Sequence, residues 1–323
     1  PRAMLFDVFA HSFFNPEEEM SAAEMLQYFH FYFMANPESL CFDVLDGPLS
    51  AILWDPLRTY LEERGVTFHL GTRVDSVARG QGEGGEHWDV YVSSADGSSE
   101  RPHLTADGVV LAANVQGLQG IVDRSPHLGN PHWRGQIAAL EPTNPYAVLR
   151  LWYDGDVSPD RVPFASTSGA GILDSVSLYH RLEESSARWH ATTGGAVIEL
   201  HAYAVPRRLW GDEDAIAQEL LDGLHNLYPE VKNLTETQRR YHVMQDCPAF
   251  KVNTFTSRPP VETPHDSLVL AGDLCWIPMP SGLMERATAS GFLAANKLLS
   301  GWNVRGETLY SVPTRGILAG VLR

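Results

Sequence analysis

The most constraining feature of the sequence is a short apolar strand that runs into a Gly-Asp pair and is followed by a helix rich in small side chains. Leu268-Val269-Leu270 predicts the buried strand, and a helix is predicted over about 281–299. Between them, Gly272 lets the backbone approach a ligand closely, and Asp273 can accept hydrogen bonds from sugar hydroxyls. The helix start offers free amides to an anionic ring or phosphate. The same residues also fit an ordinary strand–turn–helix in which the Asp is an N-cap.

Length and charge limit the class of protein. The 323 residues allow about two domains. Hydrophobic residues make up 44%, which excludes a mainly disordered chain. Asp and Glu number 40 against 24 Lys and Arg, for a net charge of −16. Such a chain repels phosphate backbones, and no basic face is evident, so we expect no nucleic-acid partner.

Cysteines and metal motifs give a further constraint. Cys41, Cys247 and Cys275 are far apart and form no CxxC pair, which argues against a disulfide framework and a structural zinc site and suits a reducing compartment. There is no HExxH, GxSxG or P-loop motif, and we expect no metal. No apolar run approaches the roughly 18 residues that cross a bilayer. The opening Pro1-Arg2-Ala3-Met4 leads directly into an apolar segment, as in a chain cut from a larger protein.

Two helices are predicted in the first quarter of the chain. The first begins near Ser21, where Ser21 and Glu24 form a capping-box pattern, and continues through an aromatic run at 25–34. Because aromatic rings cover nearly every side of it, this helix should be buried or lie against an apolar ligand. The second runs from about Leu49 to Arg64, with a kink at Pro56.

The pattern then changes to strands that alternate with helical segments, which predicts an α/β fold. The predicted strands, with one amphipathic helix at Asp214–Leu227, are Val66–Leu70, Arg73–Val77, Trp88–Val92, Gly108–Ala113, Tyr146–Tyr153, Val176–Arg181 and Val197–Val205.

One apparent dinucleotide motif is not one. Gly80-Gln81-Gly82-Glu83-Gly84-Gly85 satisfies GxGxxG, but a dinucleotide fingerprint must open a helix. The segment that follows, His87–Val92, has a strand pattern instead. We therefore interpret the glycines as a hairpin loop.

The C-terminal motifs carry a family resemblance. Leu270-Ala271-Gly272-Asp273, Met284–Gly291 and Ala294-Ala295-Asn296 resemble the flavin-binding segment of the amine oxidase/phytoene desaturase superfamily. Shorter motifs are similar to carotenoid-ring desaturase/methyltransferases of the isorenieratene synthase type: His30–Phe33, Glu199–Pro206, Arg258-Pro259 and Tyr310–Pro313. The resemblance covers nearly the whole chain. The resemblance does not include the family's N-terminal strand–GxGxxG–helix or the acidic residue that holds the ribose.

The resemblance implies FAD bound between two lobes, with an apolar tunnel for a carotenoid. The FAD-binding, Rossmann-like lobe would be discontinuous and incomplete, comprising 56–117 and 262–301, and a mixed α+β substrate lobe would comprise 1–55 and 118–261, with 302–323 as a tail.

The resemblance also assigns cofactor-binding residues. Val74 would lie on the strand whose backbone meets the adenine, and Ala112 and Ala113 would end the strand that approaches the cofactor. Asp273, following Gly272, would bond the ribityl chain.

The start of the last helix would meet the pyrimidine edge of the flavin. The residues concerned are Gly282, Leu283 and Met284. A catalytic role for Glu285, close to the ring, is a further expectation, although Glu285 and Arg286 also suit structural ion pairs. Arg258 resembles a family Arg near the flavin, but a surface ion pair is its simplest interpretation.

Four residues are predicted to contact or act on the substrate: Phe29, Phe33, His201 and Tyr203. For the two rings of the aromatic helix, ordinary core packing is the alternative. His201 alternates with Glu199 and Tyr203 on one strand face, which predicts a polar strip and a catalytic role for His201; a buried histidine with satisfied hydrogen bonds is the alternative.

Together these features predict an FAD-dependent oxidoreductase that desaturates a carotenoid by hydride transfer to flavin N5, with ring aromatisation and a methyl shift as an extension. The alternatives are an amine oxidase of the same superfamily and a non-catalytic fragment that holds no flavin. A hydrophobic carotenoid substrate implies peripheral membrane contact on the cytoplasmic side, or in a plastid if the source is eukaryotic.

Overall fold

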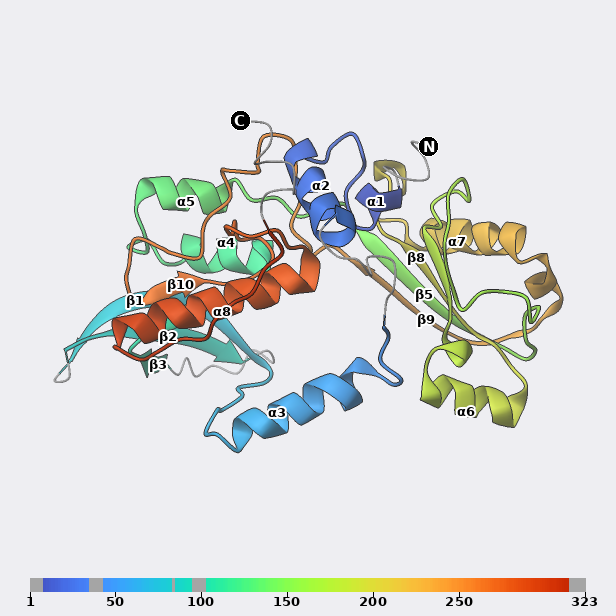
Figure 1. Cartoon of the computed structure of the whole chain (residues 1–323), viewed down its shortest axis with the longest axis horizontal. Helices are drawn as coiled ribbons and strands as arrows, with labels where there is room; N and C mark the ends of the chain where they lie inside the picture. The colour runs from blue at the N-terminus through green and yellow to red at the C-terminus, as the bar shows by residue number, and fades with distance from the viewer. Residues whose placement is uncertain (1–7, 35–42, 83–84, 95–102, 314–323) are drawn as a thin grey trace. The chain divides into compact units, whose positions relative to one another are not determined.

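The computed structural model describes residues 8–34, 43–82, 85–94 and 103–313. Cys41 and the opening Pro1-Arg2-Ala3-Met4 lie outside these ranges. The described residues form two compact units (Figure 1): unit 1 from residues 8–18, 43–68 and 143–245, and unit 2 from residues 19–34, 69–82, 85–94, 103–142 and 246–313.

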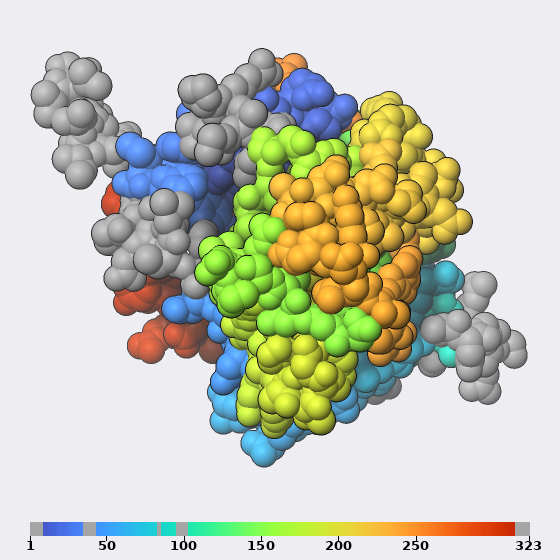
Figure 2. All heavy atoms as spheres, turned by 90° about the vertical axis from the view of Figure 1, so that its right-hand side faces the viewer, coloured from blue at the N-terminus to red at the C-terminus, as the bar shows by residue number. Residues whose placement is uncertain are grey.

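Unit 1 is built on a five-stranded antiparallel sheet with the order β6-β7-β8-β5-β9. Its strands are β5 (Tyr146–Tyr153), β6 (Phe164–Ser166), β7 (Ser175–Leu178), β8 (Val197–Ala202) and β9 (Glu236–Met244). Its helices are α1 (Val8–His11), η3 (Ser50–Trp54), α3 (Asp55–Glu62), η4 (Tyr179–Arg181), α6 (Glu184–Thr193), η5 (Arg207–Leu209), α7 (Glu213–Leu227) and η6 (Pro229–Asn233). Figure 2 shows the surface of this unit, in which residues 143–245 run from green through yellow to orange and residues 43–68 are blue.

The core of unit 1 lies between one face of this sheet and α7 (Figure 1). Strand β5 has the strict alternation of a half-buried strand, with Leu149 and Leu151 fully buried. Ile216 and Leu220 of α7 belong to the same apolar cluster. Asp212 caps α7 by accepting a hydrogen bond from the Ala215 amide at 3.0 Å. On the opposite face of the sheet, Arg150 of β5 lies opposite Glu199 of β8, and Val148 lies opposite His201.

Unit 2 combines a three-stranded antiparallel sheet with a two-stranded parallel one. Its strands are β1 (Thr72–Gly82), β2 (Gly85–Ser94), β3 (His103–Ala106), β4 (Val109–Leu111) and β10 (Leu268–Leu270). Its helices are α2 (Ala22–Phe29), η2 (His30–Met34), α4 (Val115–Asp123), α5 (Pro131–Ala138) and α8 (Leu283–Gly301). Strand β10 pairs in parallel with β4, and Leu270 and Ala294 of α8 share one buried core.

The glycine-rich segment is a hairpin, as predicted. Strands β1 and β2 pair antiparallel on either side of it, with Gly82 opposite Gly85. The backbone therefore turns back on itself instead of entering a helix.

Two strand predictions were wrong. Val66–Leu70 forms no strand, because no strand pairs with it in the described part of the chain, and Val66 and Leu70 are solvent-exposed. The strand predicted over Val176–Arg181 ends at Leu178, where the chain turns into η4 and Glu183 N donates to Tyr179 O at 2.9 Å.

The capping box predicted for the first helix was also wrong, although α2 begins where expected. The Ser21 side chain makes no cap bond. The Ser21 amide, which Glu24 would have reached, already donates to Phe250 O at 2.7 Å. Glu24 points instead into the core. After Phe29 the helix widens into the π-helix η2, which changes the direction in which the later aromatic rings point.

The boundaries of the two units differ from those expected from the sequence. Residues of α4, α5 and the segment from Asp246 onward pack with β4 and β10, because Leu118, Ile137 and Val261 share the core of unit 2. The identity of the units as cofactor and substrate lobes stays a prediction. Among the described residues, no helix has the length and apolarity to cross a bilayer.

Candidate functional site

The predicted cofactor junction is assembled at the carboxyl end of the parallel strand pair. Ala112 and Ala113 follow β4, and Gly272 and Asp273 follow β10, so the four residues lie at one edge of the sheet. In parallel α/β sheets this is the edge where ligands bind. Gly272 has a φ of +133°, which favours glycine there.

The Ser290 side chain joins helix α8 to this junction by hydrogen bonds. The Gly272 amide donates to Ser290 Oγ at 2.8 Å, and Ser290 Oγ lies 3.1 Å from the Gly272 carbonyl. Ser290 is fully buried. The small side chain at this position lets the helix approach the sheet closely.

Asp273 is a partly buried carboxylate at the same edge. Burial raises its pKa to about 6, against the opposing charge of Arg286, which lowers it. With a pKa near 6 the group is mostly ionised at neutral pH. Its carboxylate already accepts backbone hydrogen bonds at Asp273 and Leu274, and its remaining lone pairs can accept from a hydroxyl donor.

A buried ion cluster supports the start of α8. Glu24 accepts a hydrogen bond from Arg286 Nη2 at 2.9 Å and another from Arg258 Nη2. Arg286 also donates to the Ser281 carbonyl at 2.8 Å. All three charged side chains are at most 3% exposed. The interpretation of Arg258 as a surface ion pair was wrong, because its partner is a core residue 234 positions away.

The charges in this cluster balance only when Asp273 is included. Burial is the largest cause that lowers the pKa of Arg258, to about 9, and repulsion from Arg286 also lowers it. The charge of Asp273 raises this pKa. Two guanidinium groups therefore face two carboxylates, Glu24 and Asp273. Since Glu24 is enclosed by the two Arg side chains, Asp273 is the carboxylate that remains able to bind a ligand.

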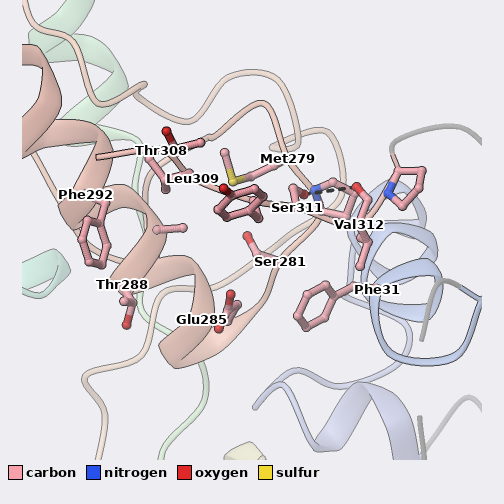
Figure 3. Close-up of a pocket in the computed structure, with 14 residues that line it drawn as sticks. Phe31, Met279, Ser281, Glu285, Thr288, Phe292, Thr308, Leu309, Ser311 and Val312 are labelled. Carbon is pink, nitrogen blue, oxygen red and sulfur yellow. Dashed lines mark hydrogen bonds between the residues drawn. The ribbon is translucent and has the colours of Figure 1, made fainter. Parts of the chain in front are cut away.

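An apolar pocket of about 560 Å³, which we call the α8 pocket, lies beside the first turns of α8 (Figure 3). Phe31 and Phe292 stand at opposite ends of it, with Ser281 and Glu285 between them. Ser281 Oγ is buried without a hydrogen-bond partner among the described residues. The size of the α8 pocket, and its apolar wall interrupted by polar side chains, are those of a small-molecule site.

A second pocket, of about 700 Å³, contains three predicted cofactor residues. Val74, Ala112 and Ala113 all line it, together with the largely apolar side of β4. The structure thus brings together residues that are 38 or more positions apart in sequence (Val74 and Ala112). Their assignment to the cofactor stays a prediction.

The helix start itself has an unusual backbone. Leu283, the first residue of α8, has a φ of +49°, a conformation that L-residues rarely adopt. Met284 next to it is 61% exposed. Met284 and Glu285 are exposed, Leu283 is partly buried and Gly282 is buried, so only the first turn from Leu283 onward is open to a ligand that binds free helix amides.

The π-helix η2 changes which aromatic side chains of the first predicted helix line a pocket. Phe29 and Phe33 are partly buried and pack on each other with ring centroids 4.9 Å apart. Phe31, for which the sequence predicted no role of its own, is the ring of η2 that lines the α8 pocket. The shift from α- to π-helix after Phe29 could not be anticipated from the run of aromatic residues alone.

The predicted polar strip is present in unit 1. His201 Nε2 lies 2.9 Å from Glu199 Oε1, and His201 Nδ1 lies 2.9 Å from the Tyr203 hydroxyl. Arg150 Nε donates to Glu199 Oε2 at 2.6 Å. Burial would raise the pKa of Glu199, but the hydrogen bond from His201 and the charge of Arg150 outweigh it and lower that pKa to about 2.

This network includes a serine hydroxyl that is not accessible for nucleophilic attack. Ser175 Oγ lies 3.2 Å from His201 Nδ1, so Ser175, His201 and Glu199 resemble a hydrolytic triad. Ser175 is only 1% exposed, however, and no substrate can reach its hydroxyl. The two residues predicted to be catalytic lie in different units: His201 belongs to unit 1 and Glu285 to unit 2.

Comparison with known proteins assigns the family. Residues 2–299 match the family described as flavin containing amine oxidoreductase. The chain belongs to this family. The predicted superfamily and the predicted flavin cofactor, FAD, are thereby confirmed at the level of the family.

Several proteins with similar sequences have names that refer to carotenoids. A carotenoid phi-ring synthase of Streptomyces griseus is 41% identical, over 97% of this chain and 58% of the relative. A carotenoid phi-ring synthase of Chlorobaculum tepidum is 26% identical, over 96% of this chain and 64% of the relative. The chain therefore spans about three fifths of the length of these relatives.

The fold is also that of the family. Cyclohexylamine oxidase from Brevibacterium oxydans IH-35A matches 94% of this chain and 64% of its own, with a TM-score of 0.64 and 14% identity. At that identity the likeness concerns the fold alone. It confirms the predicted α/β FAD-binding fold class.

Proposed function

We propose that this chain forms part of an FAD-dependent oxidoreductase that desaturates a carotenoid. The observation that carries the proposal is the 41% identity, over 97% of the chain, to a carotenoid phi-ring synthase. Aromatisation of an end ring with a methyl shift is the corresponding finer proposal. Bound flavin supplies the acceptor for a hydride.

The residues at the sheet edge fit such a cofactor. Asp273 is an ionised acceptor for ribityl hydroxyls, Gly272 allows close approach, and the α8 amides near Gly282 favour negative charge on a ring. Val74 and Ala113 line a pocket large enough for part of a dinucleotide. We infer that these residues of unit 2 bind the cofactor.

We further propose that the polar strip of unit 1 and the aromatic residues serve the substrate. His201 would accept or hold a proton, with Glu199 stabilising its charged form, and Tyr203 would contact the polyene. Phe29 and Phe33 would contribute apolar surface, and Glu285 would act near the ring. A water-insoluble substrate also favours peripheral membrane contact.

The test is pigment analysis in a carotene-accumulating host. The chain is expressed alone, and together with the portion of a carotenoid phi-ring synthase that it does not match. An altered carotene in the second case, with less of it formed by Asp273→Ala, supports the proposal. Unaltered carotenes contradict it; oxidation of amines by the purified protein would then indicate an amine oxidase, and purified protein that takes up no flavin would indicate a non-catalytic fragment.

A further inference from the structure

One carboxylate and two imidazoles converge in unit 1, outside the polar strip. Asp156 comes from the loop after β5, His180 from η4 and His190 from α6. One potential ligand atom of each lies within 4.8 Å of the others. His180 is buried and Asp156 is exposed, so the cluster is open to solvent on its carboxylate side. Three separate elements therefore present their donors to one point.

The backbone fixes the orientation of His190. Its Nδ1 lies 2.8 Å from the Gly195 carbonyl, which can only accept, so Nδ1 carries the proton. In a neutral imidazole this leaves Nε2 with a free lone pair. Histidines that bind metals typically donate their other ring N–H to a carbonyl or carboxylate in this way.

His180 can adopt the same tautomer without moving. Its Nδ1 lies 3.2 Å from the Val197 carbonyl and 3.1 Å from the Val197 amide, so a partner exists for either state of that nitrogen. In one tautomer Nε2–H donates to Asp156 Oδ1, at 2.9 Å. In the other, Nδ1–H donates to the carbonyl, and the Nε2 lone pair faces the carboxylate.

Two further hydrogen bonds orient the Asp156 carboxylate. Its Oδ2 accepts from Arg181 Nη2 at 3.3 Å, and Oδ1 accepts from the Val157 amide at 2.8 Å. The separation between Oδ1 and His180 Nε2 is close to the ~3.3 Å between two ligands of a tetrahedral ion with bonds of about 2.0 Å. Asp156 and His180 are thus close to a ligand–ligand distance, and a ligand atom of His190 lies within 4.8 Å of both.

We propose that Asp156, His180 and His190 bind a divalent transition-metal ion of the zinc class. Imidazole and carboxylate donors suit zinc, and three protein ligands leave a fourth position for water. Binding shifts the His180 proton from Nε2 to Nδ1, so the imidazole remains neutral. The sequence predicted no metal because these residues form no recognisable spacing motif, and the site does not depend on the proposed oxidoreductase activity.

The test is zinc titration of the full chain after removal of metals with a chelator. Calorimetry should give one ion per chain, and Co²⁺ in place of Zn²⁺ should give visible d–d absorption. Loss of a ligand in His190→Ala or Asp156→Asn should weaken binding by at least about 100-fold, the upper end of what loss of a supporting group costs. His242→Ala, at an exposed histidine of β9, should bind as the parent does.

Thermal unfolding provides an independent readout. Zinc should raise the Tm of the parent and of His242→Ala but not that of the two ligand variants. Asp156 is exposed, so Asp156→Asn keeps the test valid if His190→Ala fails to fold. A parent that binds no zinc, or equal zinc affinity in the parent and both ligand variants, would overturn the proposal.

Discussion

Glu24 Oε2 accepts a hydrogen bond from Arg286 Nη2 at 2.9 Å, although the two residues are 262 positions apart in sequence. Both side chains are at most 1% exposed. The guanidinium group of Arg286 also lies 5.0 Å from the ring centroids of Tyr28 and Phe250. This contact ties the aromatic helix α2 to the first turn of α8, the turn predicted to meet the flavin.

Removing the charge of Glu24 should therefore destabilise unit 2 strongly. In Glu24→Gln two buried guanidinium groups lose their shared carboxylate, which costs about 3–5 kcal/mol of unfolding free energy. Urea unfolding followed by tryptophan fluorescence measures the change. Glu141→Gln, which breaks the exposed pair with Lys251, is the control and should unfold like the parent. Equal unfolding curves for the two variants would contradict the buried cluster.

Asp273 should make stability depend on pH in a specific direction. Burial raises its pKa from 3.8 to about 6, so the folded protein binds this proton more tightly than the unfolded chain. Ionising the group therefore lowers stability as pH rises through that range. Asn cannot ionise, so the stability of Asp273→Asn relative to the parent should rise by about 3 kcal/mol between roughly pH 4 and pH 7. Urea unfolding at several pH values tests this, and a difference independent of pH would refute it.

The same carboxylate should matter for flavin retention. Asp273→Ala is expected to weaken the binding of FAD by about 1–3 kcal/mol, the cost of losing a hydrogen bond to a charged group. Fluorescence quenching of added FAD measures the affinity. Asp266→Ala, at a fully exposed carboxylate, should leave it unchanged. Equal affinity in both variants would remove Asp273 from the site.

Two glycines of the junction should respond to alanine with opposite signs. Gly272 has a φ of +133°, where a Cβ is strained, so Gly272→Ala should lose more than about 1 kcal/mol. Gly291 lies inside α8 with no atom within 4 Å of an added Cβ. Gly291→Ala should therefore gain about 0.5–1 kcal/mol. Thermal unfolding of the two variants provides the comparison; a stabilising Gly272→Ala would disprove the assigned backbone conformation.

Glu199 should contribute stability that acid removes. Its pKa is lowered from 4.5 to about 2 in the folded protein, so its contribution is complete above about pH 4.5 and lost as the pH falls toward 2. Glu199→Gln should lose about 3 kcal/mol at pH 7 and show a weaker dependence on acid. Glu184→Gln, at an exposed residue of α6, is the control. Parallel acid-unfolding curves for Glu199→Gln and the parent would speak against the network.

Local patterns predicted several elements correctly. Strand β5 has the bounds expected from its alternation, and α7 begins one residue before the position expected from its acidic start. The Gly80–Gly85 hairpin and the β10–α8 junction also follow from nearby residues alone. In each case the periodicity of apolar residues, or a glycine at a turn, is sufficient to set the local conformation.

The sequence by itself determined the strand–Gly-Asp–helix order and the alternation of β8, because short-range hydrogen bonding and side-chain periodicity act within a few residues. Only the tertiary structure decided the partners of Glu24, which accepts hydrogen bonds from two distant Arg side chains and does not cap a helix. It also decided the position of Phe31, which η2 turns toward the α8 pocket. It also brought Asp156, His180 and His190 together. These outcomes depend on which buried charges and rings meet in space, and no local pattern encodes contacts between residues far apart in the chain.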